Sequence, residues 1–422
     1  MRLARGVNLT SILARSVATK QNRIIAAIAA CAIHLALLAP TVGLQGGVLG
    51  TDFGPEAEAI EAGEQPYRDQ DLEYPPLAVP VLVVPALFGD SLDSYNVAFE
   101  VEMLAVDLAI VLLLALALPG TLRHLIGALG VYTLGILALS GIVLGHSDID
   151  EAPLALGRFD LVPAALVLAA ALARQAGRSA TWGALLSAGV AVKAFPLAVF
   201  PALARGEPRP RRVAVAAAVP LLAAALLVLV LGDEFWSAIT YHTGRGLQIE
   251  SLAATPLEIG AINDVGKGAV YGSGSWNYVA GGADLARAVT IGLLVTSYAV
   301  VLWAGWRARV SPLRQATALL AVIVAFSPVL SPQFLFWLLP LSAAAYGAGA
   351  ANAVLLAAFV LTQLMLQFYS RIVVDFDPEF VWRLAGRNAV LLAYAAVVCV
   401  PIVRAALRDE GREPGPAGAG AT

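Results

Sequence analysis

Charged residues are scarce in this chain, and that scarcity indicates its class. Only 14% of the 422 residues are charged and 59% are hydrophobic, whereas a soluble globular domain carries roughly 25% charged residues. The formal net charge is −3, so the chain lacks the basic field that nucleic-acid binding requires. This composition predicts an all-α polytopic membrane protein, because each bilayer-spanning helix needs about 20 apolar residues.

Cysteine is almost absent as well. The two cysteines, Cys31 and Cys399, lie far apart inside apolar runs. Such a pair argues against a disulfide framework and against a thiolate metal site. The informative residues are therefore the few charged ones, because each of them is costly in lipid.

Apolar stretches long enough for membrane helices recur along the chain. A shorter apolar segment, 76–88, is rich in proline and predicts an interfacial or re-entrant segment. Lys193-Ala194-Phe195-Pro196 interrupts one of the long stretches, because proline removes a backbone donor and disfavours a helical predecessor. With that break counted, we expect about 12 membrane helices. The long stretches are 24–44, 95–118, 122–145, 158–174, 179–204, 211–231, 286–305, 313–329, 333–348, 350–371 and 385–404.

The basic residues predict the orientation of the chain in the membrane. They gather at the N-terminus, in three short loops and in the C-terminal tail, and such segments face the cytoplasm. All of these basic segments can face the cytoplasm only if the stretch 179–204 enters and leaves the membrane on the cytoplasmic side. We therefore expect a multi-pass protein of the cell membrane whose long loops face outward. Its parts are a basic cytoplasmic N-terminus (1–23), a transmembrane catalytic domain (24–404) with external loops 45–94 and 232–285, and a disordered cytoplasmic tail (405–422).

The first external loop is strongly acidic. Residues 51–80 contain eight acids and one basic residue. Asp52, just beyond the first apolar stretch, is either a catalytic carboxylate at the outer surface or an acid that marks a helix end. The segment 56–64 predicts a short amphipathic surface helix whose acids are mostly solvated. A turn (63–67) and the segment Glu73-Tyr74-Pro75-Pro76 follow this helix. Tyr67, Glu73 and Tyr74 in them are substrate-site candidates.

Two Asp-x-Asp patterns raise the question of a metal. Asp69-Gln70-Asp71 and Asp148-Ile149-Asp150 match a pattern that some sugar transferases use for a divalent cation. So short a pattern often occurs by chance. We therefore favour a metal-independent reaction without a cofactor.

The densest polar cluster is the segment "YHTGRGLQIES", residues 241–251. His242 and Arg245 stand three residues apart, with glycines at 244 and 246, and Arg offers a fork of donors suited to phosphate oxygens. The alternative is an ordinary loop with a surface Arg–Glu pair. Further substrate-site candidates are Gln248 and Glu250 in this segment and Gln333 near the chain's later Ser-Pro breaks.

Lys193 is the residue of the predicted membrane region with the highest free-energy cost of insertion into lipid. A lysine at bilayer depth costs roughly 2.5–3.5 kcal/mol on insertion scales, so it should pair with an acid or with a ligand phosphate. Asp107, in the middle of an apolar stretch, is a possible acid partner. We expect His34 and His124 to be interfacial or packing residues.

These features together favour an outward-facing glycosyl transfer from a polyprenyl-phosphate sugar. Nucleotide sugars stay in the cytoplasm, so an external reaction needs a lipid-carried donor. A phosphate leaving group needs no protonation, so one carboxylate base suffices, unlike the two that a glycosidase uses. The alternatives are a polytopic transporter or lipid-linked-sugar flippase, which inverted repeats would favour, and a non-catalytic assembly partner.

The order of the motifs resembles one known family. Asp52, "GEQPY" (63–67) and "EYPPL" (73–77) look like the opening of the polyprenol-phosphate-mannose-dependent mannosyltransferases of glycosyltransferase family 87, which have the GT-C membrane fold. The resemblance covers about residues 24–400. It is also carried, in the same order, by "GRFD" (157–160), "AVKAFPL" (191–197), "YHTGRGLQIES" and "LSPQFLFWLLPL" (330–341).

The resemblance implies roles for individual residues. Asp52 corresponds to the acid taken as the catalytic base of an inverting transfer, and His242 to the histidine at the donor phosphate. Arg245 and Lys193 match less closely beside that phosphate. The implied donor is polyprenyl-phosphate mannose, and the implied acceptor is a membrane glycolipid or glycan.

Overall fold

The structure is a computed structural model. It describes residues 17–43, 53–69, 72–89, 91–140, 154–232, 245–262, 269–272, 274–366 and 376–409. Two of the predicted functional residues, Asp52 and His242, lie outside the described residues. So do three aspartates of the Asp-x-Asp patterns, namely Asp71, Asp148 and Asp150.

Helices dominate the described part of the chain, as the composition predicts. Within the described residues, one α-helix covers most of each predicted apolar stretch, except 179–204, which forms a broken series of helices. Residues 17–232 form α2 (Lys20–Leu38), η1 (Ala39–Thr41), α3 (Gly54–Glu61), α4 (Ala78–Val83), η2 (Val84–Phe88), α5 (Leu92–Ala117), α6 (Leu122–Leu139), α7 (Leu154–Gly157), α8 (Leu161–Gln175), α9 (Ser179–Val192), η4 (Phe195–Val199), α10 (Phe200–Ala204) and α11 (Pro210–Leu231). Residues 245–409 form α13 (Thr255–Ile259), α14 (Ala283–Arg307), α15 (Pro312–Phe326), η5 (Pro332–Phe334), α16 (Leu335–Tyr346), α17 (Ala350–Leu366) and α19 (Pro378–Asp409).

Local sequence explains where several helices begin. The hydroxyl of Thr19 accepts a hydrogen bond from the backbone N–H of Asn22 at the start of α2, and Thr121 caps α6 in the same way. Ser91 and Ser94 cap α5 reciprocally, each side chain accepting the other's backbone N–H. Such caps satisfy amide groups that have no partner inside the helix.

Five helices of the described chain are long and apolar enough to cross a membrane. They are α2 with η1, α6, α11, α14 and α19. The other apolar helices found in this way, among them α8, α15 and α17, have 10–17 residues. The predicted total of 12 membrane helices therefore stays a prediction.

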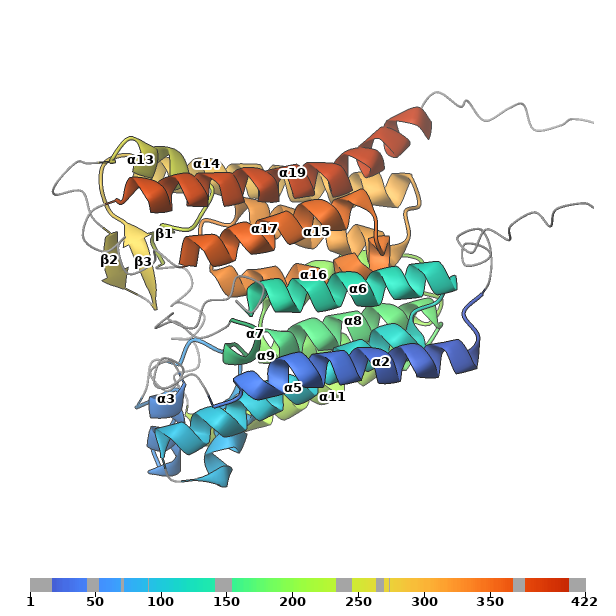
Figure 1. Ribbon diagram of the computed structural model, residues 1–422, viewed down its shortest axis with the longest axis horizontal. Coiled ribbons are helices and arrows are strands. Elements are labelled where there is room, and N and C mark those ends of the chain that lie inside the picture. The colour runs from blue at the N-terminus through green and yellow to red at the C-terminus, as the bar shows by residue number, and fades with distance from the viewer. Residues whose placement is uncertain are drawn as a thin grey trace, which may run out of the picture.

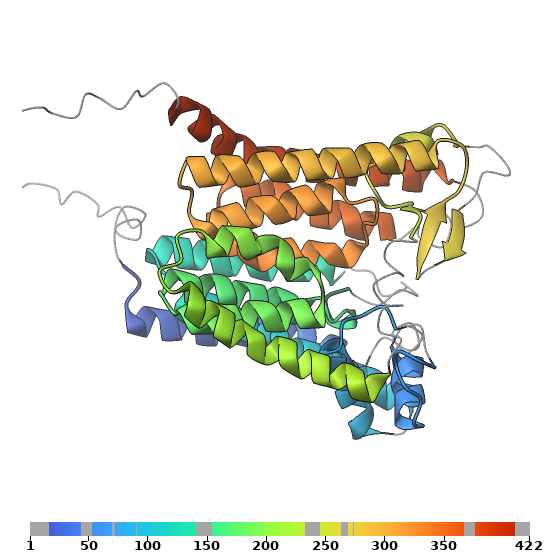
Figure 2. The same cartoon turned by 180° about the vertical axis from the view of Figure 1, so that it is seen from behind.

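The helices form two groups that lie side by side (Figure 1). The first contains α2, α5, α8, α9 and α11, and the second contains α14, α15, α17 and α19. Two further helices join the groups, because α6 packs on α16 and α17, and α16 packs on α8. On the rear side α11 and α14 form much of the surface (Figure 2), and only 11% of the apolar window of each is buried.

The molecule has two distinct ends. α2 begins and α19 ends at one of them, which we call the terminal end (Figure 1). The opposite end carries α3, α13 and a small sheet, and we call it the sheet end. The sheet consists of β1 (Leu247–Gln248), β2 (Ala269–Gly272) and β3 (Ser275–Tyr278), antiparallel in the order β1-β3-β2. The all-α expectation did not include these strands.

The stretch 179–204 folds back as predicted. α9 ends at Val192, and η4 and α10 return the chain toward the start of α9. Glu207, just beyond α10, accepts hydrogen bonds from the Ser179 hydroxyl at 2.6 Å and from the Trp182 indole at 2.8 Å. The two ends of this hairpin therefore lie at the same end of the molecule.

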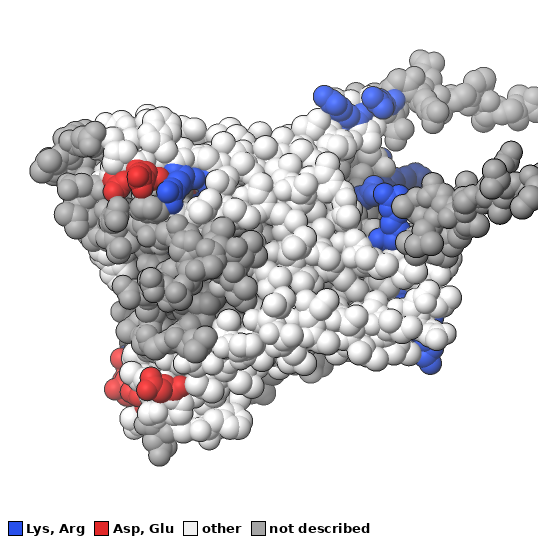
Figure 3. Space-filling model, in the orientation of Figure 1, with Lys and Arg blue, Asp and Glu red and all other residues white. Residues whose placement is uncertain are grey.

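The predicted cytoplasmic loops also meet at one end. The Arg174 guanidinium donates to the carbonyls of Leu203 and Arg205, and Arg307 donates to the carbonyl of Ala406 near the end of α19. In the view of Figure 3, Lys and Arg side chains gather at the terminal end, and Asp and Glu lie at the sheet end beside a single basic patch. This separation of charge is the pattern on which the predicted orientation depends.

A buried polar network lies between α2, α5 and α6. Asp107 of α5 contacts Nδ1 of His34 at 2.6 Å and accepts a hydrogen bond from the Tyr132 hydroxyl at 2.8 Å. The other ring nitrogen of His34 lies 2.9 Å from the Thr133 hydroxyl oxygen. Asp107 is thus satisfied within the protein, so its predicted pairing with Lys193 is wrong.

The acidic segment 56–64 follows the prediction of a short surface helix. α3 is a short surface helix, and the acidic side chains of Glu58 and Glu61 on it are exposed. The proline-rich segment 76–88 forms two short helices, α4 and η2, instead of one long one.

Candidate functional site

Lys193 occupies the break between α9 and η4. Its backbone is extended (φ −155°, ψ 138°), and Pro196 follows within the first turn of η4. Its ammonium nitrogen Nζ lies 2.8 Å from Oδ1 and 3.0 Å from Oδ2 of Asp160. The lysine side chain is 15% exposed and the aspartate side chain 1%. Asp160 is thus the acid partner of Lys193, one of the two kinds of partner expected from the cost of a lysine in lipid.

Asp160 is held from a second direction. Its Oδ1 also accepts a hydrogen bond from the Trp337 indole at 2.6 Å. Asp160 directly precedes α8, whereas Trp337 lies in the first turn of α16. The carboxylate therefore fastens α16 to the start of α8 in the first helical group.

Aromatic rings surround the lysine. Its Nζ lies 4.8 Å from the ring centroid of Phe159, 5.5 Å from that of Tyr74, 5.8 Å from that of Trp337 and 5.9 Å from that of Phe334. Cations are attracted to ring faces within about 6 Å. Trp337 is itself stacked between Phe195 and Phe334, at 4.1 and 3.9 Å between centroids. The rings thus hold the ammonium in one place.

A second ion pair lies beside the first. Nη1 of Arg245 is 3.5 Å from Oε2 of Glu73, with side-chain exposures of 10% and 21%. Tyr74 joins the two pairs, because it follows Glu73 in the chain and its ring faces Lys193. Burial raises the pKa of the Tyr74 phenol well above its usual range, and the charge and hydrogen bond of Glu73 act in the same direction. We call Glu73, Tyr74, Asp160, Lys193 and Arg245 the charge cluster.

The first external loop of the prediction is docked onto this cluster. The Tyr67 hydroxyl donates to the carbonyl of Tyr74 at 2.7 Å, and the Tyr67 backbone N–H donates to the carbonyl of Leu231 at the end of α11. The backbone N–H of Leu77 donates to the carbonyl of Ala191 near the end of α9. Tyr67 is buried and supports the loop, so it does not line an open site.

Three further predicted site residues, Gln248, Glu250 and Gln333, lie in the described part of the chain. Gln248, in β1, donates from its side-chain amide to the Ser331 hydroxyl at 3.0 Å. Glu250 is buried, and its carbonyl accepts hydrogen bonds from Arg387 and Asn388 of α19. Gln333 lies in η5 next to Phe334, one of the rings around Lys193.

Asp160 and Trp337 were not among the site residues predicted from the sequence. Both lie in motifs that carry the family resemblance, "GRFD" and "LSPQFLFWLLPL", but neither motif was interpreted chemically. The cost of Lys193 predicted a pairing with an acid or with a ligand phosphate. It did not say which acid, because Asp107 and Asp160 both lie at predicted membrane depth or close to it.

The described residues offer no metal site of the usual kind. Among them, no group of three or more His, Cys, Asp and Glu side chains could hold a metal ion. Asp69, from the first Asp-x-Asp pattern, instead accepts a hydrogen bond from the backbone N–H of Gln65 at 2.8 Å.

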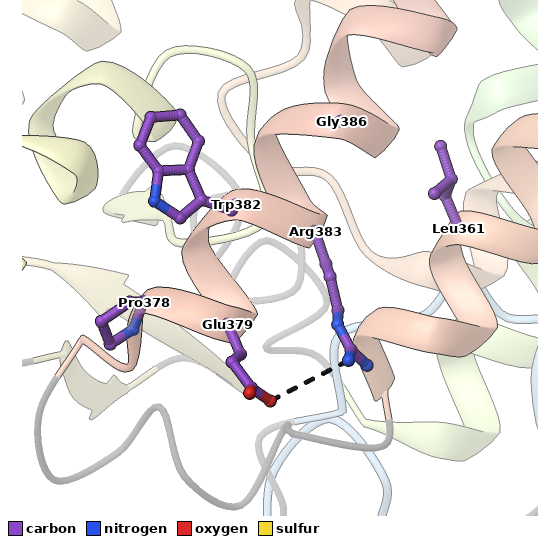
Figure 4. A pocket seen from close by; sticks show the side chains of 6 residues that line it. All are labelled: Leu361, Pro378, Glu379, Trp382, Arg383 and Gly386. Atoms are coloured by element: carbon purple, nitrogen blue, oxygen red, sulfur yellow. Dashed lines mark ion pairs between the residues drawn. The ribbon is translucent and has the colours of Figure 1, made fainter.

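A cavity of about 480 Å³ lies away from these residues, between α17 and α19 (Figure 4). Leu361 and Gly386 form part of its wall, and the side chains of Glu379 and Arg383 approach to 3.9 Å. It shares no residue with the charge cluster, and Trp382 at its edge is 60% exposed. Aromatic and basic side chains of this kind are typical of a membrane–water interface.

Comparison with known proteins assigns the family. The profile of glycosyltransferase family 87 matches residues 72–332. That range is more than half of the 422 residues and contains the whole charge cluster. No curated protein and no solved structure matches the chain. The chain therefore belongs to glycosyltransferase family 87 and is a membrane glycosyltransferase.

Proposed function

We propose that this glycosyltransferase transfers mannose from a polyprenyl-phosphate donor to a glycolipid or glycan acceptor on the outer face of the cell membrane. The observation that carries the proposal is the charge cluster, in which Tyr74 faces Lys193 and also feels the charge of Arg245. Two neighbouring cations suit a phosphate, whose oxygens accept charge-assisted hydrogen bonds. His242, three residues before Arg245, would supply a third donor.

The distribution of charge supports a donor carried on a lipid. The basic loops gather at the terminal end, which by the positive-inside rule faces the cytoplasm. The sheet end, with Arg245 two residues before β1, then faces outward. A nucleotide sugar would not reach that side, whereas a polyprenyl-phosphate sugar would lie in the membrane beside the apolar helices.

Asp52 is our candidate for the general base. The next residue, Phe53, is buried, and its ring lies 5.8 Å from that of Phe159 and 6.2 Å from that of Tyr74. Both of those rings also face Lys193. The contacts of Phe53 therefore support a base beside the donor phosphate. We propose that Glu73, Tyr74, Gln248, Glu250 and Gln333 line the sugar and acceptor sites around it.

The proposed transfer is one displacement. Asp52 takes the proton of the acceptor hydroxyl as that oxygen bonds the anomeric carbon. The bond from this carbon to the phosphate oxygen breaks, and its electron pair stays on the phosphate, which needs no proton. Because the acceptor attacks opposite the leaving phosphate, the anomeric configuration inverts. Lys193, Arg245 and His242 hold the phosphate, so we expect no metal or other cofactor.

We also propose the complete membrane arrangement. The apolar helices, with the hairpin at Lys193 counted as two, would give 12 membrane helices with both termini in the cytoplasm. The fold would be of the GT-C type, with a long first external loop. The hydrogen bonds of Glu207 to the start of α9 close this hairpin and support the parity.

Substitution of Asp52 tests the proposed function. Asp52→Asn keeps the shape but removes the proton acceptor, so donor binding should persist while turnover falls by roughly 10²–10⁴, the usual share of general base catalysis. Asp52→Glu should recover little, because transfer tolerates small misplacement poorly. Asp69→Asn, the same change in the same loop, is the control and should keep turnover. Near-normal turnover of Asp52→Asn would remove Asp52 from this role.

A further inference from the structure

The charge cluster contains as much negative as positive charge. Lys193 is paired with Asp160 at 2.8 Å, and Arg245 with Glu73 at 3.5 Å. Two cations and two carboxylates give a formal sum of zero. A site that only had to attract a phosphate would not need the carboxylates, since each of them repels an incoming anion.

The proposed reaction changes the charge of the bound lipid. The donor is a phosphodiester with one negative charge. When the acceptor oxygen bonds the anomeric carbon, the electron pair of the broken bond stays on the phosphate and the acceptor proton goes to the base. The lipid product is a phosphate monoester, which carries close to two negative charges above about pH 6. Two uncompensated cations would therefore hold the product more tightly than the donor.

We propose that Glu73 and Asp160 are fixed counter-ions that keep the affinity for the dianionic product low, so that the polyprenyl phosphate leaves after transfer. This inference rests on the proposed function, because it takes the lipid phosphate to bind at Lys193 and Arg245. Product release limits turnover in many enzymes, so a lower affinity for the dianionic product favours turnover.

The two carboxylates differ in how firmly they are held. Asp160 is 1% exposed and accepts hydrogen bonds from both Lys193 and Trp337, the latter at 2.6 Å. Glu73 is 21% exposed, and its distance to Arg245 is longer, at 3.5 Å. Glu73 is therefore the counter-ion that can give way to an entering phosphate, while Asp160 keeps Lys193 in place.

The test compares two lipid ligands that differ by one charge. A short-chain isoprenyl phosphate is dianionic at about pH 8, and its methyl ester is monoanionic. Their dissociation constants are measured by calorimetry for the purified wild-type protein and for Glu73→Gln. We expect Glu73→Gln to lower the dissociation constant of the monophosphate, relative to that of the ester, by roughly tenfold. The reason is that the second charge of the monophosphate no longer meets the carboxylate of Glu73.

Two further variants separate a counter-ion from a structural role. Glu73→Asp keeps the charge, so the ratio of the two dissociation constants should stay near that of the wild type. Glu61→Gln makes the same change of charge at an exposed position of α3 and should leave the ratio unaltered. Asp160→Asn, where it folds, should shift the ratio in the same direction as Glu73→Gln.

The outcomes distinguish the inference from the function on which it rests. If the wild-type protein binds neither ligand and the Asp52 test also fails, the proposed function is wrong. If the wild type binds both ligands but Glu73→Gln leaves the ratio unchanged or lowers the preference for the monophosphate, only the counter-ion role is wrong. An equal shift in Glu61→Gln would also overturn that role.

Discussion

Asp160 and Trp337 are 177 residues apart in the chain, yet the indole of Trp337 donates a 2.6 Å hydrogen bond to the carboxylate of Asp160. The same carboxylate holds Lys193. One buried acid thus ties α8, the α9–η4 break and α16 together, and the proposed donor site is built on that connection.

The first prediction separates the stability that this pair provides from its function. Asp160→Leu leaves Lys193 without its acid and should lower the free energy of unfolding by about 3 kcal/mol, the lower part of the range for one lost partner of a buried pair, since Lys193 is 15% exposed. Lys193→Met/Asp160→Leu should recover most of this stability, because a buried ion pair is often replaceable by apolar residues.

Turnover should not return with stability in the double variant. Thermal unfolding of the detergent-solubilised protein and turnover are measured on the same samples. A double variant with wild-type turnover would show that Lys193 takes no part in binding the donor.

The second prediction concerns Arg245. Arg245→Gln removes a charged donor to the phosphate, an interaction of about 1.5–3 kcal/mol, so kcat/KM for the donor should fall roughly 10- to 150-fold. The KM for the acceptor should change little. Arg383→Gln, which alters an arginine on α19 outside the charge cluster, serves as the control. A change confined to the acceptor KM would place Arg245 elsewhere.

The third prediction follows from a buried acid near the sheet. Glu258 of α13 is fully buried, and burial followed by the neighbouring Glu250 raises its pKa well above the ordinary value of 4.5, against the opposing effect of Arg387. The folded state therefore favours the protonated carboxyl, whereas the unfolded chain ionises near pH 4.5. The protein should lose stability as the pH rises from about 4.5 to the raised pKa.

Glu258→Gln removes this dependence. Its melting temperature should exceed that of the wild type at pH 7.5, and the difference should vanish as the pH falls toward 4.5. Melting curves of both proteins across that interval provide the measurement. A constant difference at every pH would mean that ionisation of Glu258 is not involved.

The fourth prediction concerns orientation. In a background with Cys31→Ala and Cys399→Ala, a cysteine placed at Glu61 on α3 should react with a membrane-impermeant maleimide in intact cells. A cysteine placed at Arg209, just before α11, should react only after permeabilisation, because the basic loops face the cytoplasm. Both positions are exposed in the structure. The reverse labelling pattern would invert the topology and remove the argument for a lipid donor.

Much of the fold could be predicted from the sequence because apolar length is a strong signal. Each predicted apolar stretch coincides with helical structure, and the break at Lys193 follows from Pro196. The sheet could not be predicted, since its strands have two to four residues and no recognisable alternation. The missed pairings depend on tertiary contacts. Asp107 meets His34 across 73 residues, and Lys193 meets Asp160 across 33.

Individual site residues could be predicted only where a charge is costly in lipid or where several polar residues lie close together in the sequence. Lys193 was identifiable by its cost in lipid, and Arg245 by the glycines and polar residues around it. Asp160 and the rings around Lys193 looked like ordinary loop and packing residues. Nothing in the local sequence "GRFD" indicates an acid that accepts hydrogen bonds from two side chains.

The central claim is that the sugar comes from a lipid-linked donor and is transferred without a metal. The most direct test incubates the purified protein, in EDTA, with a membrane glycolipid extract and either polyprenyl-phosphate mannose or nucleotide-activated mannose, followed by mass spectrometry of the products. The account predicts addition of one hexose from the lipid donor only, and loss of that product in Asp52→Asn. Transfer from the nucleotide donor, or no hexose added from the lipid donor by a folded protein, would contradict it.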